Sequence, residues 1–232
     1  MRVLITRPQR QGERTAQRLF ELGHEAVMMP LSEPVHDGAT AIAALAKTTG
    51  ALAITSAEAI RALSDQAASL TQHLDRPLYA VGNATAEAAI AAGFRTVKTA
   101  SGDGCDLAEL IAAETTGAVT YLAGRPRAET FERRAAALGL RISIAECYRM
   151  EQIAPGSDAR ETLQQAPPDA ILLYSRETAI GLFRFFNPLP EWLTATRILC
   201  LSDAVAAAVP AGLQKNLRTA AMPDEQSLLS LL

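Results

Sequence analysis

The chain has 232 residues, of which 49% are hydrophobic and 20% are charged, with a formal net charge of -3 at pH 7. This length and apolar content suffice for one large domain or two domains of ordinary size, each with its own core. Because the chain has no overall basic field, we expect no nucleic-acid partner.

No run approaches the roughly 18 apolar residues of a membrane-spanning helix. The first residues, 2–6, are typical of a strand rather than of a signal peptide. We therefore expect no membrane association and a cytoplasmic location. The three cysteines, Cys105, Cys147 and Cys200, lack metal-ligand spacing and fit reduced thiols packed as small apolar groups.

Short apolar or β-branched runs alternate with helical patterns along the first half of the chain. In chain order, strands are expected at 3–5, 25–29, 51–54, 78–81 and 95–98, with helices after 8, at 40–47, after 57, after 83 and at 106–114. Residues 31–38, with Pro34 and Gly38, are typical of a linker. This alternation of strand and helix predicts an α/β fold with parallel sheets.

The stretch 78–93 has the clearest pattern of all. Four apolar residues stop at Gly82-Asn83, and a helix of small residues then continues to Gly93, which can adopt the left-handed cap. Helix N-termini at the carboxyl edge of a parallel sheet present unpaired N–H groups to anions. We therefore expect Gly82, Asn83, Ala84 and Thr85 to bind an anionic small molecule.

The second half of the chain repeats the first. A strand at 119–122 is followed by a turn at Gly124-Arg125-Pro126 and a helix that stops at Gly139. Equivalent positions are separated by about 120 residues. The matched pairs are Gly23 with Gly139, Ser56 with Ser175, Gly82 with Ser202, and Leu107 with Leu228.

Linker-like segments follow the second strand of each copy, so the chain is expected to leave one domain, build the other and return. The predicted domains are residues 1–32 plus 154–232, and residues 38–142. Residues 33–37 and 143–153 are the expected hinge connections. A ligand is expected between strand-to-helix turns of the two lobes, as is usual for hinged domains.

These segments resemble the uroporphyrinogen-III synthase family over the full length of the chain. The matching residues are Val3-Leu4-Ile5-Thr6-Arg7-Pro8, Gly23-His24-Glu25 through Pro30, Ile54-Thr55-Ser56, Val81-Gly82-Asn83-Ala84-Thr85-Ala86, Cys147-Tyr148 and the strand end at Ser175. The resemblance implies two flavodoxin-like α/β domains, formed by a swapped internal duplication and joined by a two-stranded hinge.

The resemblance also implies an activity, the cyclising dehydration of hydroxymethylbilane to uroporphyrinogen III with inversion of the last pyrrole ring through a spiro intermediate. No cofactor or metal is implied. The expected partner is this small molecule, with transient handover from hydroxymethylbilane synthase, and a hinged chain fits a monomer.

By the same resemblance, Tyr148 is the candidate catalytic residue, donating a proton to the departing hydroxyl. The alternative is a half-buried tyrosine that only packs at a domain junction. The candidate substrate-binding residues are Arg7, Thr55, Ser56, Gly82, Asn83, Ala84, Thr85, Gly124, Arg125, Ser175 and Ser202. For Thr85, Ser56 and Ser175 helix capping is the alternative role, and for Arg125, Arg127 and Arg176 it is a solvated surface position.

Two positions depart from the family pattern. Asp203 follows Ser202 where the family tends to have hydroxyl residues, and Glu58 stands where basic or polar residues are common. Asp203 would repel an anionic ligand unless its side chain faces away from it. We expect the alternative role for Asp203, the capping of a helix.

Other motifs are weak. Gly102-Asp103-Gly104 lacks the third glycine of a dinucleotide fingerprint, and the histidines stand in no metal-ligand pattern. The remaining alternative to the enzyme is a two-lobed binding or sensor protein for an anionic small molecule, without catalysis. Formation of type III rather than type I porphyrin from the bilane distinguishes the two.

Overall fold

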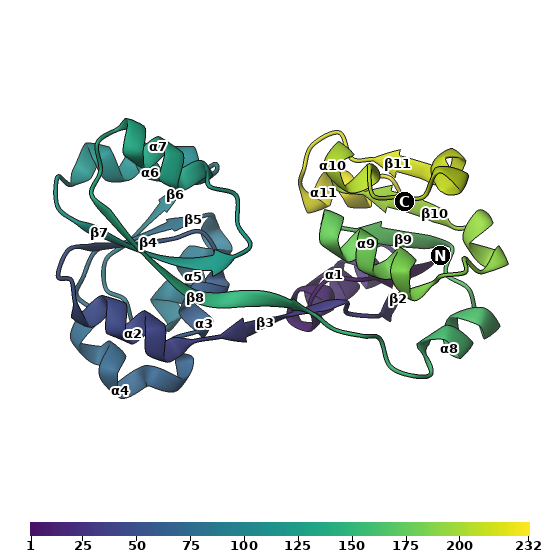
Figure 1. The fold of residues 1–232 in the computed structure, drawn as a ribbon, viewed down its shortest axis with the longest axis horizontal. Coiled ribbons are helices and arrows are strands. Elements are labelled where there is room, and N and C mark those ends of the chain that lie inside the picture. The colour runs from purple at the N-terminus through teal and green to yellow at the C-terminus, as the bar shows by residue number, and fades with distance from the viewer. The chain divides into compact units, whose positions relative to one another are not determined.

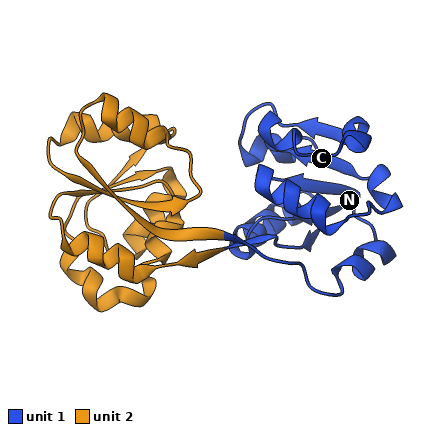
Figure 2. Ribbon diagram, in the orientation of Figure 1, with its two compact units in different colours: residues 1–33, 151–232 blue, residues 34–150 orange.

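The computed structural model describes all 232 residues, which form two compact units (Figure 2). Unit 1 consists of Met1–Glu33 and Glu151–Leu232, and unit 2 consists of Pro34–Met150. The chain therefore begins in unit 1, builds unit 2 and returns. Each unit contains one sheet with helices on both faces (Figure 1).

Unit 1 has a five-stranded sheet of order β11-β10-β9-β1-β2, and every adjacent pair is parallel. Apolar residues on α1 and α11 cover one face, and those on α8, α9 and α10 cover the other. The elements are β1 (Arg2–Ile5), α1 (Gln9–Glu21), β2 (Glu25–Met28), α8 (Ala159–Gln165), β9 (Ala170–Leu173), α9 (Arg176–Phe185), β10 (Arg197–Cys200), α10 (Asp203–Ala206), β11 (Leu217–Thr219) and α11 (Glu225–Leu229). Short 3₁₀ helices lie at Glu191–Thr194 and Ala211–Asn216.

Unit 2 has a six-stranded sheet of order β3-β8-β7-β4-β5-β6. Helices α2, α3, α4 and α5 cover one face, whereas α6 and α7 cover the other. The elements are β3 (Ser32–His36), α2 (Gly38–Ala46), β4 (Ala51–Ile54), α3 (Ala57–Arg61), α4 (Ala67–Leu70), β5 (Leu78–Val81), α5 (Asn83–Ala91), β6 (Val97–Ala100), α6 (Gly104–Glu114), β7 (Val119–Arg125), α7 (Thr130–Ala137) and β8 (Ile142–Gln152). Short 3₁₀ helices lie at Ser64–Gln66 and Thr71–His73.

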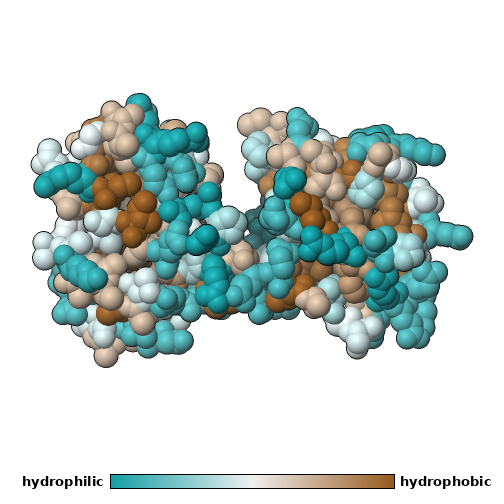
Figure 3. All heavy atoms as spheres, viewed as in Figure 1, coloured by the Kyte–Doolittle hydropathy of each residue, from teal (hydrophilic) through white to brown (hydrophobic).

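The central strands are continuously apolar because both of their faces are covered by helices. In β4, Leu52 and Ile54 enter the core under α2, α3 and α5, while Ala51 and Ala53 enter the core under α6 and α7. The alternation of side chains along a strand thus supplies two cores at once. On the face shown in Figure 3, apolar side chains form small patches among hydrophilic ones on each unit. None of the helices is both long and apolar enough to cross a membrane.

The strand orders confirm the swapped duplication. Each strand of unit 1 corresponds to its predicted repeat in unit 2 when the two sheets are compared in the orders β2-β1-β9-β10-β11 and β8-β7-β4-β5-β6. Each unit therefore takes its first two strands from one copy and its last three from the other. This arrangement is the predicted α/β fold class.

Within the segment 31–38, which by composition is typical of a linker, Ser32–His36 forms the edge strand β3 beside β8, in agreement with the two-stranded hinge that the resemblance implies. The Asp37 N–H donates to the Cys147 carbonyl at 2.7 Å, and the Ile153 N–H donates to the Leu31 carbonyl at 3.0 Å. Residue numbers therefore rise along β3 as they fall along β8, so this pair is antiparallel. Most of the expected connection 143–153 likewise lies in β8, which pairs with β7 as far as Arg149.

Two smaller expectations also differ from the structure. The weak strand expected at 95–98 is Val97–Ala100, shifted by its register with β5. The turn expected at Gly124-Arg125-Pro126 begins later, because β7 continues through Arg125. In contrast, Gly82 and Gly93 adopt positive φ angles of 73° and 99° at the two ends of α5, as their sequence context predicts.

A buried arginine holds one end of unit 2 together. Arg76 is 8% exposed and has no carboxylate partner. Its guanidinium donates to the Gly50 carbonyl at 2.7 Å, to the Leu45 carbonyl at 3.1 Å and to the hydroxyls of Thr48 and Thr120. Burial lowers the pKa of Arg76, but these acceptors compensate the charge locally.

Arg76→Met is expected to lower the free energy of unfolding by about 2 kcal/mol, because four acceptors lose their donor while relief of the buried charge offsets part of the loss. Urea unfolding followed by far-ultraviolet circular dichroism measures this. Arg95→Met is the matched control, since Arg95 and its partner Asp75 are each 71% exposed, and it should change stability by less than about 0.5 kcal/mol. Equal effects of the two substitutions would contradict the argument.

Candidate functional site

The candidate residues of unit 2 lie level with one another at the carboxyl edge of its sheet. Leu122 pairs with Ile54, and Ile54 pairs with Ala80. Two residues further along each strand, Gly124, Ser56 and Gly82 therefore share one level of the sheet. Tyr148 pairs with Gly124 and joins them from β8.

A β-bulge brings Tyr148 opposite Gly124. The register of β8 against β7 shifts between Ala123, which pairs with Glu146, and Gly124, which pairs with Tyr148. The extra residue, Cys147, is fully buried. Bulges of this kind re-aim the side chains that follow them, and here Tyr148 packs against the core beneath α2, α3 and α5.

The Tyr148 ring lies directly on the backbone of Gly124. A Cβ atom placed on Gly124 would be 2.1 Å from Cζ and 2.4 Å from the hydroxyl oxygen of Tyr148. No side chain fits at position 124 unless the phenol moves. Gly124 thus contributes to the site by leaving the space that the Tyr148 ring occupies.

The Tyr148 phenol is held in its protonated form. Burial raises its pKa, and the charge of Glu58 adds to that effect, whereas the interaction with the Ser56 side chain and the charge of Arg127 oppose it. Since the net shift is upward from the ordinary value of 10.0, the phenol keeps its proton at neutral pH. Tyr148 can therefore donate a proton to a bound molecule.

The residues that follow β4 have local partners. The Ser56 hydroxyl accepts the Glu58 N–H at 3.2 Å and caps α3, so the capping role expected as an alternative is present. The Thr55 hydroxyl lies 2.9 Å from the Tyr121 hydroxyl, whose pKa is raised by burial to about 12. Thr55 is thus tied to the core, whereas Ser56 links α3 to Tyr148.

The N-terminus of α5 presents free donors. Gly82 is the N-cap residue, and its carbonyl accepts the N–H groups of Thr85 and Ala86, both at 3.2 Å. The N–H groups of Asn83 and Ala84 make no backbone hydrogen bond, and both residues are exposed. The alternative that Thr85 caps this helix is wrong, because it is the third helical residue.

Two arginines follow β7 in different settings. Arg125 is 74% exposed on its side chain, and its nearest carboxylate is Glu146 at 3.9 Å. Arg127 donates to Glu132 at 2.6 Å, to Glu146 at 2.7 Å and to the Gly124 carbonyl at 3.0 Å. Arg125 is available to a ligand carboxylate, whereas Arg127 fixes the loop.

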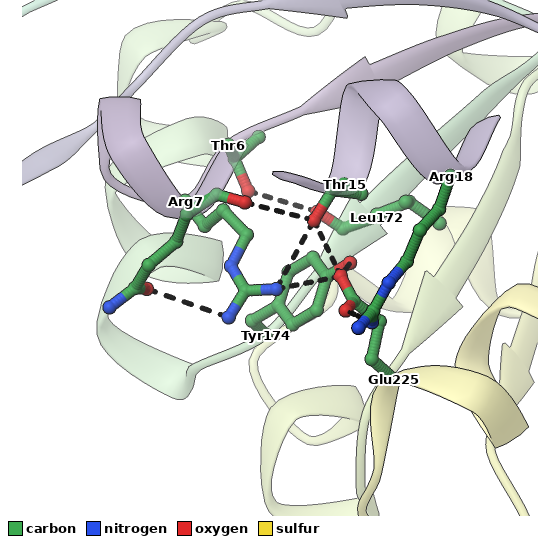
Figure 4. A network of polar contacts seen from close by, with 8 residues as sticks. Thr6, Arg7, Thr15, Arg18, Leu172, Tyr174 and Glu225 are labelled. Carbon is green, nitrogen blue, oxygen red and sulfur yellow. Dashed lines mark hydrogen bonds and ion pairs between the residues drawn. The ribbon is translucent and has the colours of Figure 1, made fainter. Parts of the chain in front are cut away.

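In unit 1, Arg7 is engaged within the protein (Figure 4). Its guanidinium donates to Glu225 at 2.8 Å and lies 4.0 Å from the centre of the Tyr174 ring. Glu225 also accepts from Thr15 at 2.5 Å, from Tyr174 at 3.0 Å and from Arg18. Binding of a substrate carboxylate by Arg7, the strongest of the arginine candidates in the sequence, would compete with Glu225.

The other candidates of unit 1 also lie at strand ends. Ser175 caps α9, accepting the Thr178 N–H at 3.1 Å. Ser202 is at the N-cap position of α10 but makes no capping hydrogen bond. The expectation that Asp203 caps a helix is wrong, because it is already the first helical residue and makes no such bond. Arg176 is exposed and pairs with Glu177 at 3.4 Å, as expected for a solvated arginine.

Glu225 anchors the C-terminal helix to α1, which yields a stability prediction. Glu225→Gln should lower the free energy of unfolding of unit 1 by roughly 2 kcal/mol, because two guanidinium groups lose their only shared carboxylate. Fluorescence of Trp192, the only tryptophan, reports unfolding of this unit.

The control for this experiment is Glu177→Gln, which removes an ion pair whose side chains are 61% and 60% exposed. It should shift the unfolding midpoint little, as surface pairs contribute at most about 1 kcal/mol. If both substitutions have the same small effect, the Glu225 network does not stabilise unit 1.

Sequence reasoning missed three features of the candidate site. They are the positions of His36 and Glu225 and the packing of the Tyr148 ring on Gly124. Glu225 is 218 positions from Arg7, and no local pattern marks it. His36 lies in the segment assigned to a linker, so the approach of its Nε2 to within 2.9 Å of a Glu58 carboxylate oxygen could not be anticipated. No cluster of three or more His, Cys, Asp or Glu side chains is placed to hold a metal ion.

This fold defines a class of α/β proteins that have two units, each with a mainly parallel sheet, and that arose from a duplication with exchanged segments. The candidate ligand-binding turns lie at the carboxyl edges of the sheets. The family model described as uroporphyrinogen-III synthase HemD matches residues 13–230. The chain therefore belongs to the uroporphyrinogen-III synthase family, the cyclising lyases of tetrapyrrole biosynthesis that act on hydroxymethylbilane.

Two solved structures share the fold. The uroporphyrinogen-III synthetase of Helicobacter pylori 26695 has 17% sequence identity and a TM-score of 0.64, over 100% of this chain and 98% of that one. A mutant uroporphyrinogen III synthase of Thermus thermophilus has 21% identity and a TM-score of 0.54, over 90% and 87% of the two chains. A search of curated protein sequences finds no significant match.

Proposed function

We propose that Tyr148 is the proton donor when this chain cyclises hydroxymethylbilane to uroporphyrinogen III. The observation that carries the proposal is a half-buried, protonated phenol at the carboxyl edge of unit 2, packed on Gly124, which lies level with Ser56 and Gly82 in the same sheet. The Ser56 hydroxyl accepts the Glu58 N–H at 3.2 Å, and its interaction with the phenol lowers the pKa of Tyr148, opposing the effect of burial.

The reaction needs one proton delivered and one removed. The phenol proton goes to the terminal hydroxyl, the C–O bond breaks with its electron pair on oxygen, and water leaves as the pyrrole nitrogen supplies electrons to the carbon. After ring closure through the spiro intermediate, a pyrrole carbon loses a proton, which the Tyr148 phenolate takes back. The catalyst therefore returns to its starting state without a cofactor.

Selection of the inverted ring depends on how the bilane is held. The free N–H groups of Asn83 and Ala84, the Thr85 hydroxyl and Arg125 are the groups we assign to carboxylates in unit 2. Gly82 provides the turn that leaves Asn83 and Ala84 exposed, whereas Thr85 is 7% exposed. Thr55, Ser56, Ser175, Ser202 and Arg7 are weaker assignments, because all but Ser202 already have partners within the protein.

We further propose that the chain works as a monomer in the cytoplasm and receives the bilane by transient handover from hydroxymethylbilane synthase. The support is chemical, since free hydroxymethylbilane closes by itself without inversion and a short transit limits that loss. Sedimentation of the chain alone tests the monomeric state, and sedimentation with that enzyme tests the handover.

The deciding experiment supplies bilane made in place by hydroxymethylbilane synthase and separates the oxidised type I and type III porphyrins. We expect type III to dominate when the chain is present and type I when it is omitted or heat-denatured. A product mixture that stays type I, despite bilane binding, would identify the alternative, a binding or sensor protein.

A further inference from the structure

The β-bulge in β8 decides which face of the unit 2 sheet the Tyr148 side chain reaches. Successive side chains of a regular strand point to opposite faces of a sheet. Cys147 and Tyr148 are consecutive, yet both pack against the core beneath α2, α3 and α5. The register shift between Ala123 and Gly124 allows this, because it adds one residue to β8. Without the shift, Tyr148 would pair with Arg125 and would point to the face that α6 and α7 cover.

The Arg127 guanidinium joins the two strands where their register changes. Its Nη1 donates to the Gly124 carbonyl of β7 at 3.0 Å and to the Glu146 carboxylate of β8 at 2.7 Å. Glu146 pairs with Ala123 immediately before the shift, and Gly124 pairs with Tyr148 immediately after it. One nitrogen atom therefore bridges the residues on either side of the bulge.

A third contact fixes the orientation of this guanidinium. Its Nε donates to Glu132 of α7 at 2.6 Å. The side chains of Arg127 and Glu132 are only 19% and 13% exposed, so this ion pair is weakly screened by salt. Because the guanidinium is a rigid planar fork, the contact at Nε also determines where Nη1 points. Arg127 thus ties α7, β7 and β8 together at the bulge.

Other contacts hold the bulged residue without Arg127. The Cys147 carbonyl accepts the Asp37 N–H at 2.7 Å, and the Cys147 thiol donates to the Ala123 carbonyl at 3.6 Å. These contacts remain when the guanidinium is removed. We therefore expect an Arg127 variant to stay folded, while the end of β8 gains freedom to move against β7.

We propose that Arg127 is a positioning residue for catalysis, which holds the bulged register of β8 and thereby keeps the Tyr148 ring on Gly124. This inference rests on the proton-donor role of Tyr148 proposed above. The ring lies so close to the Gly124 backbone that a Cβ atom there would be 2.1 Å from Cζ. A movement of the Gly124 carbonyl therefore changes the surface on which the phenol lies, and a displacement of about 1 Å can cost a catalytic group about a hundredfold in rate.

The first test measures the position of the ring without any activity. In the native chain we expect a nuclear Overhauser effect between the Tyr148 ring protons and the Gly124 Hα protons, and a ring-current shift of the latter. Arg127→Met should lose most of both signals. Arg134→Met is the matched control on α7, since Arg134 and its partner Glu109 are 39% and 53% exposed, and it should keep them. Native signals in Arg127→Met would refute the inference.

The second test separates positioning from charge and from substrate binding. Arg127→Met should lower kcat for type III formation about tenfold and change KM less than about twofold. Arg127→Lys keeps the positive charge but lacks the planar fork, so it should remain impaired. A raised KM with native kcat would show that Arg127 binds a substrate carboxylate. Full activity of Arg127→Lys would show that charge alone matters, and either result refutes the inference.

A double-mutant cycle separates this inference from the proposed function. In a Tyr148→Phe background the phenol proton is absent, so adding Arg127→Met should lower kcat by less than about threefold. Losses that multiply would show that Arg127 does not act through Tyr148. If Tyr148→Phe is impaired while Arg127→Met keeps native kcat, only the role of Arg127 is refuted. If Tyr148→Phe is fully active, both proposals fail. Thermal melts of each variant identify any loss of folded protein.

Discussion

Tyr148→Phe is expected to lower kcat for type III formation about tenfold or more, with little change in KM. The substitution removes one hydroxyl and keeps the ring on Gly124, so the shape of the site is preserved. General acids contribute roughly 10²- to 10⁴-fold, and the spontaneous departure of the hydroxyl from an electron-rich pyrrole explains an effect below that range. Initial rates from the coupled porphyrin assay measure it.

The matched control is Tyr79→Phe, which deletes a phenol of the same unit that bonds Glu114 at 3.0 Å. It should reduce stability by about 1 kcal/mol and leave kcat unchanged. Native turnover in Tyr148→Phe would remove Tyr148 from the mechanism and restore the alternative of a tyrosine that only packs.

The fold was predictable because its signals are local. Apolar runs such as 51–54 and 78–81 identify buried parallel strands, and glycines at Gly82 and Gly93 delimit a helix by their positive φ angles. The repeat of about 120 residues then indicated a duplication, and the position of the breaks indicated the swap. The composition of Ser32–His36, with Pro34 and polar residues, is typical of a linker, and only the resemblance, through its two-stranded hinge, indicated a strand there.

The candidate site was only partly predictable, because its contacts depend on register. Tyr148 was identified by resemblance, but the bulge at Cys147 that places it over Gly124 leaves no mark in the sequence. Arg7 was identified by type and position, yet its charge is balanced by Glu225 from the opposite end of the chain. Residue type predicts what a side chain can bind, whereas distant neighbours decide whether its donors and acceptors are free to do so.

Gly124→Ala is expected to lower kcat about a hundredfold, more than removal of the Tyr148 hydroxyl itself. A Cβ atom 2.1 Å from Tyr148 Cζ forces the ring and its hydroxyl out of position. Misplacement of a catalytic group by about 1 Å can cost that much, while the overpacking should cost about 1–3 kcal/mol in stability. Steady-state kinetics and urea unfolding measure the two effects separately.

A double-mutant cycle decides whether Gly124 acts through Tyr148. In a Tyr148→Ala background the ring is gone, so adding Gly124→Ala should lower kcat by less than about threefold. Gly117→Ala is the control for a glycine of the same unit, where the nearest atom to a new Cβ would be the Thr115 hydroxyl at 3.3 Å. If the two substitutions instead lower kcat independently, so that their effects multiply, Gly124 contacts the substrate directly. Packing of the Tyr148 ring on Gly124 would then not be the reason why position 124 lacks a side chain.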